Sequence, residues 1–250
     1  MVANPFLGAD AARRYARGRP DYVDLVVGAV RELTGIDRPI RRALDVGSGT
    51  GLSTRVLGSF ARQVIGIEPS AHMVALAPAL ANATYLRASA EHIPLARSTC
   101  GLIGAGSALH WFDQAAFLAE IDRVATNDSH LVVFDHWFNG SVDGCPEFAE
   151  WFRTYLARYP SPPRDRSWSP PSDLGGWMFA GSQSYKHPVP MTVGRLTSYL
   201  LSQSNLQVMI DRGEIVEEQL RESLADELRA VITGDVAVVE FGGLVAHLRR

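Results

Sequence analysis

The fold of this chain is decided by the stretch Leu44-Asp45-Val46-Gly47-Ser48-Gly49-Thr50-Gly51-Leu52. An apolar strand end and an acidic residue lead into three glycines at alternate positions, and a helical pattern follows. Glycine has no Cβ and tolerates positive φ, so the backbone can turn tightly and lie close to a ligand. A strand that passes through such a turn into a helix N-terminus forms a pocket of the nucleotide-binding type.

The spacing of the glycines indicates which nucleotide is bound. The dinucleotide fingerprint is G-x-G-x-x-G, but here the third glycine, Gly51, comes one residue early and Leu52 holds its place. With Asp45 two residues before Gly47, the pattern Asp-x-Gly-x-Gly-x-Gly resembles motif I of class I S-adenosylmethionine-dependent methyltransferases. The resemblance implies an α/β, Rossmann-like fold with a mostly parallel seven-stranded sheet and helices on both faces. It also implies S-adenosyl-L-methionine as cofactor and S-adenosyl-L-homocysteine as product.

Length and composition fit one large α/β domain over residues 1–250. The net charge of −3 disfavours nucleic acid as the main partner, because phosphate neutralisation needs clustered positive charge. Cys100 and Cys145 are too few for a disulfide framework or a zinc site, so we expect no metal. The N-terminal segment has no signal-peptide pattern, and no apolar run is long enough to span a membrane. We therefore expect a cytoplasmic protein without a membrane partner; its oligomeric state stays open.

Strand and helix patterns alternate along the chain, which predicts a parallel sheet with helices on both faces. A helical pattern over 10–33 precedes the first strand. The predicted strands cover 41–46, 63–67, 84–87, 101–108 and 130–135, with helices at 52–61, 69–80 and 114–125. Further helices are predicted near 193–203 and 214–232, and a last strand pair at 185–189 and 236–248.

We divide the single domain into an N-terminal helical lid (1–40), a cofactor-binding core (41–139), a substrate-lid insertion (140–182) and a C-terminal part of the sheet and helices (183–250). The insertion is rich in proline, which cannot continue a helix or a central strand, and we expect it to fold over the strand carboxyl ends. Residues 111–179 contain 14 of the chain's 22 aromatic residues. Such a lid suits a flat or largely apolar methyl acceptor.

Acidic and sulfur-containing side chains near the glycines are candidate cofactor ligands. Glu68 ends the second predicted strand 17 residues after Gly51, where a carboxylate can accept both ribose hydroxyl hydrogen bonds. Asp45 suits the ammonium group of the cofactor through a water molecule; the alternative is a capping or turn acid. Met73 is placed to lie against adenine, and a core methionine is the alternative.

Two further segments resemble the small-molecule methyltransferases related to trans-aconitate methyltransferase. The segment Gly106-Ser107-Ala108-Leu109-His110-Trp111-Phe112-Asp113 carries their Ala-x-His-Trp-Phe pattern, and Tyr15-Ala16-Arg17-Gly18-Arg19-Pro20-Asp21-Tyr22 is similar to their N-terminal segment. Ser89-Ala90-Glu91 follows the third strand, where relatives bracket adenine; many have an acid in place of Ser89. Glu91 is alternatively structural, and Arg19 alternatively an ordinary solvated arginine. The resemblance implies cofactor contacts from Tyr15, Arg19, Asp45, Gly47, Ser48, Gly49, Gly51, Glu68, Pro69, Met73, Ser89, Ala90, Glu91, Gly106 and Ser107.

Two histidines follow strand carboxyl ends, where ligands bind in such sheets: His110 after the fourth strand and His136 after the fifth. Either is a candidate general base for a hydroxyl acceptor, whereas a carboxylate acceptor needs none. The alternative is that each orders a loop or binds the cofactor. The expected substrate contacts are Trp111, Phe112, Trp137 and Trp151.

The sequence thus predicts transfer of a methyl group to a small molecule, a carboxylate or hydroxyl of a flat or apolar metabolite. Two alternatives remain open. An NAD-dependent oxidoreductase is disfavoured by Leu52 and by the long N-terminal lead. A non-catalytic protein that binds S-adenosylmethionine with this fold would keep the same glycine loop and the same Glu68.

Overall fold

The computed structural model describes residues 5–161 and 176–250, and these fall into two compact units. We call residues 21–136, 176–185 and 243–250 the sheet unit, and residues 5–20, 137–161 and 186–242 the helix-rich unit. In this division residues 5–20 and 21–40 fall into different units, and the four predicted parts stay a prediction. The long strands β5, β6 and β7 each contain residues of both units.

A seven-stranded sheet organises the fold, as the family resemblance implies, and its strand order is β3-β2-β1-β4-β5-β7-β6. The pairs β1–β2, β2–β3, β1–β4 and β4–β5 are parallel. The strands are β1 (Ala43–Val46), β2 (Val64–Ile67), β3 (Ala83–Leu86), β4 (Cys100–Gly106), β5 (Ala125–Val142), β6 (Met178–Thr192) and β7 (Val236–Arg249).

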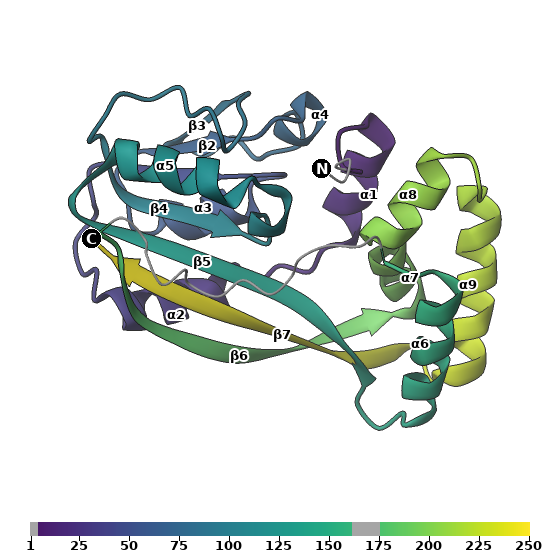
Figure 1. Cartoon of the computed structure of the whole chain (residues 1–250). Coiled ribbons are helices and arrows are strands. Elements are labelled where there is room, and N and C mark those ends of the chain that lie inside the picture. Colours follow the sequence, from purple (N-terminus) through teal and green to yellow (C-terminus); the bar gives the residue numbers. More distant parts are fainter. Residues whose placement is uncertain (1–4, 162–175) are drawn as a thin grey trace. The chain divides into compact units, whose positions relative to one another are not determined.

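The strands of the sheet unit are apolar on both faces. Successive side chains of a strand point to opposite faces, so Ala43 and Leu44 of β1 enter different cores. Ala43 packs with α2 (Val23–Thr34) and α3 (Leu52–Gly58), whereas Leu44 packs with α5 (Gln114–Val124). Figure 1 shows α2 and α5 on opposite sides of these strands. The prediction of helices on both faces is confirmed.

The helix-rich unit has a core of its own around Phe148, Tyr199 and Phe241. Its helices are α1 (Ala9–Gly18), α6 (Glu147–Arg158), α7 (Val193–Leu201), α8 (Ser204–Asp211) and α9 (Glu217–Val231) (Figure 1). Arg14 of α1 is buried and ties the unit together. Its Nε donates to Gln207 at 2.6 Å, and its two terminal nitrogens form ion pairs of 2.9 Å with Asp211 and Glu217.

Several predicted boundaries are wrong for identifiable reasons. The single helix predicted over 10–33 is two helices, because Arg19 precedes Pro20 and takes an extended conformation (φ −74°, ψ 131°). The helix predicted over 69–80 is only α4 (Ala71–Val74), since Pro78 disfavours a helical conformation at the residue before it.

The predicted insertion over 140–182 also differs from the structure. It contains α6 and the first residues of β6, and β5 runs into it as far as Val142 rather than ending at residue 135. Residues 162–175 of the predicted insertion, which include Arg164, Arg166 and Trp168, lie outside the described residues.

Candidate cofactor site and active site

The glycine loop between β1 and α3 needs glycine at all three positions, since Gly47, Gly49 and Gly51 have φ of 70°, 53° and 86°. A Cβ on Gly47 would lie 2.7 Å from the Ala108 Cβ, and one on Gly51 would lie 2.7 Å from the Tyr85 hydroxyl. A Cβ on Gly49 would instead meet open space. The first and third glycines are therefore packed, while the backbone at Gly49 is free to receive a ligand.

Glu68 follows β2 directly and fixes the glycine loop. Its Oε2 accepts a hydrogen bond from the Gly49 N–H at 3.1 Å, and its Oε1 accepts one from the Ser70 N–H at 2.9 Å. Burial raises the pKa of this carboxyl above its usual range, and the two backbone donors oppose the shift. A carboxylate has about four lone-pair sites, so two remain after these bonds. The ribose contact of Glu68 stays a prediction.

Asp45 at the end of β1 anchors the first turn of α3. It is fully buried, and its Oδ2 accepts from Ser53 Oγ at 2.8 Å and from Thr54 Oγ1 at 2.6 Å. Burial raises its pKa to about 6, opposed by these two hydroxyls. These bonds are made with side chains, whereas the N-cap of α3 is Gly51 without a side-chain cap bond, so Asp45 has a structural role but not that of a helix cap. The water-bridged ammonium contact stays a prediction.

Three buried polar atoms beside this loop lack a hydrogen-bond partner among the described residues: Asp45 Oδ1, Ser48 Oγ and the Tyr85 hydroxyl. A buried polar atom without a hydrogen bond costs roughly 1–3 kcal/mol, so native structures supply a partner from water or a ligand. These atoms, the open space at Gly49 and the remaining lone pairs of Glu68 fit a polar nucleoside ligand such as S-adenosylmethionine.

The carboxyl end of β4 is held in an unusual conformation. Ser107 has φ of 50°, although it is not glycine. Its Oγ donates to Asp135 Oδ1 at 2.6 Å. Asp135 Oδ1 also accepts a hydrogen bond from the His136 N–H at 2.9 Å. Asp135, an exposed carboxylate near the carboxyl end of β4, was not predicted from the sequence; its position directly before His136 was the available signal.

The two candidate bases lie in different surroundings. His136 is buried, with its ring centroid 5.1 Å from that of Tyr22 and 6.3 Å from that of Tyr185. His110 lies on the short helix η1 (Leu109–Trp111), half-buried, with its ring 4.9 Å from that of Trp111. His110 is therefore the more accessible imidazole of the two.

The segment that follows His110 reaches the glycine loop. Phe112 packs against Phe117 with ring centroids 5.0 Å apart, and its Cζ lies 3.1 Å from the position of a Cβ on Gly47. Phe112 thus packs against the glycine loop at Gly47. Its predicted contact with substrate, and that of the half-buried Trp111, stay predictions.

The residues predicted near adenine have mixed roles. Met73 and Ala90 are buried, and Ala90 belongs to the core on the α5 face. Glu91 Oε1 accepts from the Asp113 N–H at 3.0 Å, which gives it the structural role considered as an alternative. Ser89 is half-buried and Pro69 exposed, so both stay candidates.

Four predicted site residues belong to the helix-rich unit. The Arg19 guanidinium lies over the rings of Tyr15 and Tyr199, 4.8 Å and 5.4 Å from their centroids, rather than in open solvent. Trp151 donates from Nε1 to Glu227 at 2.9 Å, and Trp137 is 42% exposed. The contacts expected of Tyr15, Arg19, Trp137 and Trp151 with cofactor or acceptor stay predictions.

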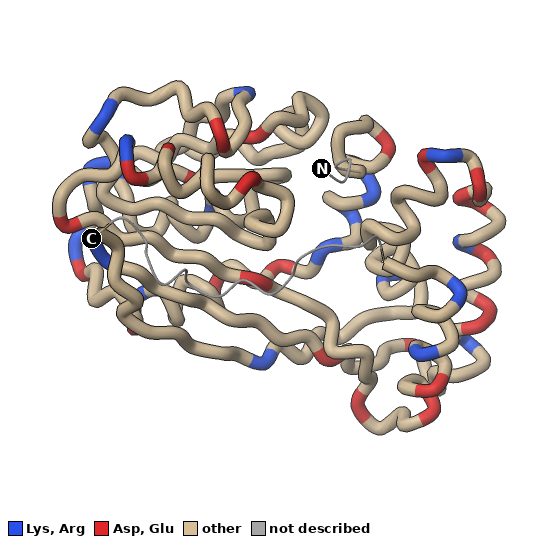
Figure 2. The backbone as a smooth tube through the Cα atoms, in the orientation of Figure 1, with Lys and Arg blue, Asp and Glu red and all other residues tan. Residues whose placement is uncertain are grey.

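Metal-ligand clusters and apolar helices were also sought in residues 5–161 and 176–250. No group of three or more metal-binding side chains comes together there. None of the helices described is both long and apolar enough to cross a membrane. Figure 2 shows acidic and basic residues interspersed along the described chain.

Comparisons with known proteins agree with this geometry. Residues 44–133, from β1 into β5, match a family model described as a methyltransferase domain. A Dictyostelium discoideum protein named as a methyltransferase is 29% identical over 125 residues, 50% of this chain and 47% of the relative. A Mycobacterium tuberculosis protein, also named as a methyltransferase, is 26% identical over 94% of this chain and 88% of its own length.

A solved structure from Anaeromyxobacter dehalogenans, titled as a type II methyltransferase, has the same fold. It superposes with a TM-score of 0.67 at 23% identity and covers 92% of this chain and 97% of its own. The matched domain contains the glycine loop, Glu68 and the segment after β4. The chain is an S-adenosylmethionine-dependent methyltransferase with the class I fold.

Proposed function

We propose that the acceptor is a small molecule, a carboxylate or hydroxyl of a flat or apolar metabolite. The observation that carries the proposal is the contact of Phe112 with the glycine loop, because it brings the His110-Trp111-Phe112 segment beside the cofactor-binding backbone. This segment is the one that resembles small-molecule methyltransferases related to trans-aconitate methyltransferase.

Bound S-adenosylmethionine supplies an already activated methyl group, so the protein's part is alignment and exclusion of water. The loop at Gly49 and the free lone pairs of Glu68 would bind the nucleoside. Ser107 and Asp135, locked together at 2.6 Å, would hold the carboxyl end of β4 in one conformation. For a hydroxyl acceptor, an imidazole nitrogen of His110 would accept the acceptor's proton; a carboxylate would need no base.

Acceptor class can be tested with labelled methyl transfer. The wild type, His110→Ala and the control His72→Ala, which removes an exposed histidine of α4, are incubated with methyl-labelled S-adenosylmethionine and a panel of aromatic carboxylates, phenols and a tricarboxylate. We expect label in an aromatic carboxylate or a phenol. For a phenol, His110→Ala should lower turnover at least about 100-fold, the range for general base catalysis, and His72→Ala should not.

The same assay separates the alternatives. Label in the tricarboxylate alone would exclude the apolar acceptor. If S-adenosylmethionine binds but no small molecule is labelled, the proposal fails in favour of a non-catalytic binder or a macromolecular acceptor. Equal phenol turnover in both variants would remove His110 from the mechanism.

A further inference from the structure

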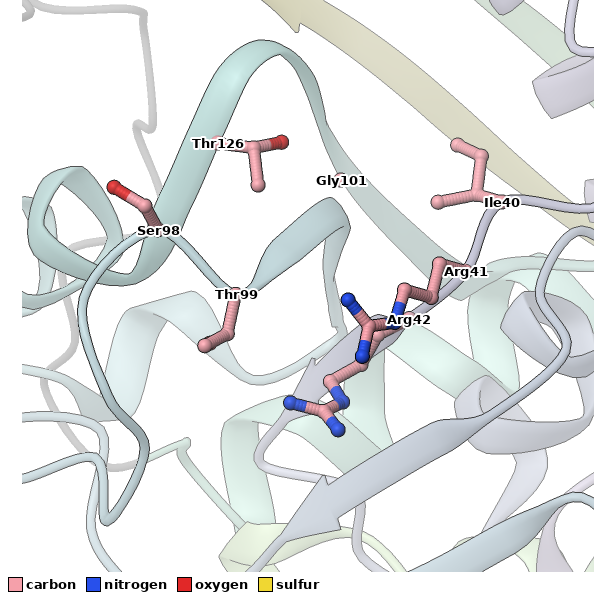
Figure 3. Close-up of a pocket in the computed structure, with 7 residues that line it drawn as sticks. All are labelled: Ile40, Arg41, Arg42, Ser98, Thr99, Gly101 and Thr126. Atoms are coloured by element: carbon pink, nitrogen blue, oxygen red, sulfur yellow. The ribbon is translucent and has the colours of Figure 1, made fainter.

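A second pocket lies at the opposite ends of the strands from the glycine loop. It has a volume of about 270 Å³ and is lined by residues from the amino ends of β1, β4 and β5: Ile40, Arg41, Arg42, Ser98, Thr99, Gly101 and Thr126 (Figure 3). Because β1 and β4 are parallel, their amino ends share one edge of the sheet and the glycine loop follows the other. The pocket is therefore separate from the cofactor site, and all its residues belong to the sheet unit.

Two arginines give this pocket its charge. Among the described residues, neither Arg41 nor Arg42 forms an ion pair with a carboxylate. Arg42 donates from Nε to the neutral side chain of Gln63 at 3.0 Å, a bond that orients the guanidinium without cancelling its charge. Figure 3 shows both side chains extending toward the same side of the pocket. Two like charges held together favour an anion between them.

The rest of the lining keeps its shape through backbone contacts. The Gly101 N–H donates to the Arg42 carbonyl at 3.1 Å, which joins β4 to the arginine segment. Thr99 and Thr126 donate their hydroxyl protons to the carbonyls of Ala96 (2.9 Å) and Cys100 (3.3 Å). Their hydroxyl protons are therefore used within the protein, and the arginines are the charged donors for a ligand.

Glycine at position 101 keeps the pocket open. A Cβ there would lie 2.9 Å from Ile40 Cγ2 and 3.7 Å from Thr126 Oγ1, so any side chain would crowd the space between them. Ser98 at the rim has φ of 53°, a conformation that non-glycine residues adopt rarely and mostly where function or packing demands it. The site is thus a shaped, positively charged hollow rather than two arginines on a flat surface.

We propose that this pocket binds the phosphate or diphosphate group of a small molecule. The guanidinium group presents paired N–H donors that match phosphate oxygens, and it remains charged at any relevant pH. The ligand would bind on the side of the sheet away from methyl transfer, so the site is independent of the proposed acceptor.

Calorimetric titration of the full chain with inorganic pyrophosphate, inorganic phosphate and citrate, at constant ionic strength, tests the proposal. We expect saturable binding to the wild type, weakened at least tenfold in Arg41→Gln/Arg42→Gln. Arg38→Gln is the matched control, because it removes an exposed arginine from the same segment that does not line the pocket. It should bind like the wild type.

A second variant tests shape without changing charge. Gly101→Ala keeps both arginines but places a methyl group against Ile40 in the pocket lining. It should therefore also weaken pyrophosphate binding. Thermal unfolding and S-adenosylhomocysteine binding are measured on every variant to show that the fold and the cofactor site are intact. Absence of saturable binding to the wild type, or equal weakening by Arg38→Gln, would overturn the proposal. Preference for citrate over pyrophosphate would replace phosphate with carboxylate as the ligand class.

Discussion

The substitution Gly49→Ala separates the loop's role in ligand binding from its role in stability. Gly49 has φ of 53°, and a Cβ there meets nothing within 4 Å. An L-residue in this left-handed conformation costs roughly 1–2 kcal/mol, and loss of unfolded-state freedom returns about 0.4–1 kcal/mol. The net loss is about 1 kcal/mol, or a fall in Tm of roughly 2–4 °C for a chain of this size.

Gly144 provides a matched control for this substitution. It has φ of 67°, again with nothing within 4 Å of an added Cβ, but it lies in the turn before α6. Gly144→Ala should therefore lower Tm by a similar amount. Only Gly49→Ala places a methyl group in the space through which a ligand approaches the loop backbone.

Calorimetric binding of S-adenosylhomocysteine distinguishes the two variants. We expect Gly49→Ala to weaken binding at least tenfold, while Gly144→Ala binds as the wild type does. If Gly49→Ala binds with wild-type affinity after losing the expected stability, the cofactor does not approach this backbone and the interpretation of the loop is refuted.

Three further predictions concern the buried carboxyls Glu68 and Asp45 and the half-buried His130. Glu68→Gln should destabilise the chain by roughly 1–3 kcal/mol and weaken S-adenosylhomocysteine binding, because an amide cannot accept from both the Gly49 and Ser70 N–H groups; unchanged affinity by calorimetry would contradict this. Because the folded-state pKa of Asp45 is raised to about 6, the free energy of unfolding should fall as pH rises from about 4 to 6. Asp45→Asn should remove this pH dependence when stability is measured by urea unfolding. The same pH dependence in variant and wild type would count against it. His130, whose Nδ1 lies 3.0 Å from His247 Nε2, has its pKa lowered to about 4 by burial and then by His247, so its contribution is present above pH 6.5 and lost on acidification toward pH 4. After allowance for solvent screening we expect on the order of 1–2 kcal/mol, absent in His130→Asn; identical acid unfolding of variant and wild type would exclude it.

Much of the fold follows from local patterns in the sequence. The apolar strand ends, the alternating glycines and Glu68 lie close together in the chain, and their geometry depends on local backbone requirements. The long strands could not be predicted in full. Pro188 and Pro190 argue against a strand, yet β6 continues through them because it lies at the edge of the sheet, where a missing N–H is tolerated.

The site was less predictable than the fold, because its contacts join distant segments. The sequence does not show that Ser53 and Thr54 donate to one oxygen of Asp45 and leave the other without a partner. The contact of Ser107 with Asp135 spans 28 residues and depends on the register of β4 against β5. His136 gave no sign in the sequence that two tyrosines would enclose it.

The identity of the cofactor tests the account most directly. Thermal unfolding of the full chain is followed alone and with S-adenosylmethionine, S-adenosylhomocysteine or NAD, since a ligand that binds the native state raises its stability. For the wild type we expect a rise in Tm with S-adenosylmethionine and with S-adenosylhomocysteine, and no rise with NAD. For Gly49→Ala we expect a smaller rise with each of the first two compounds. A rise with NAD alone would contradict the account.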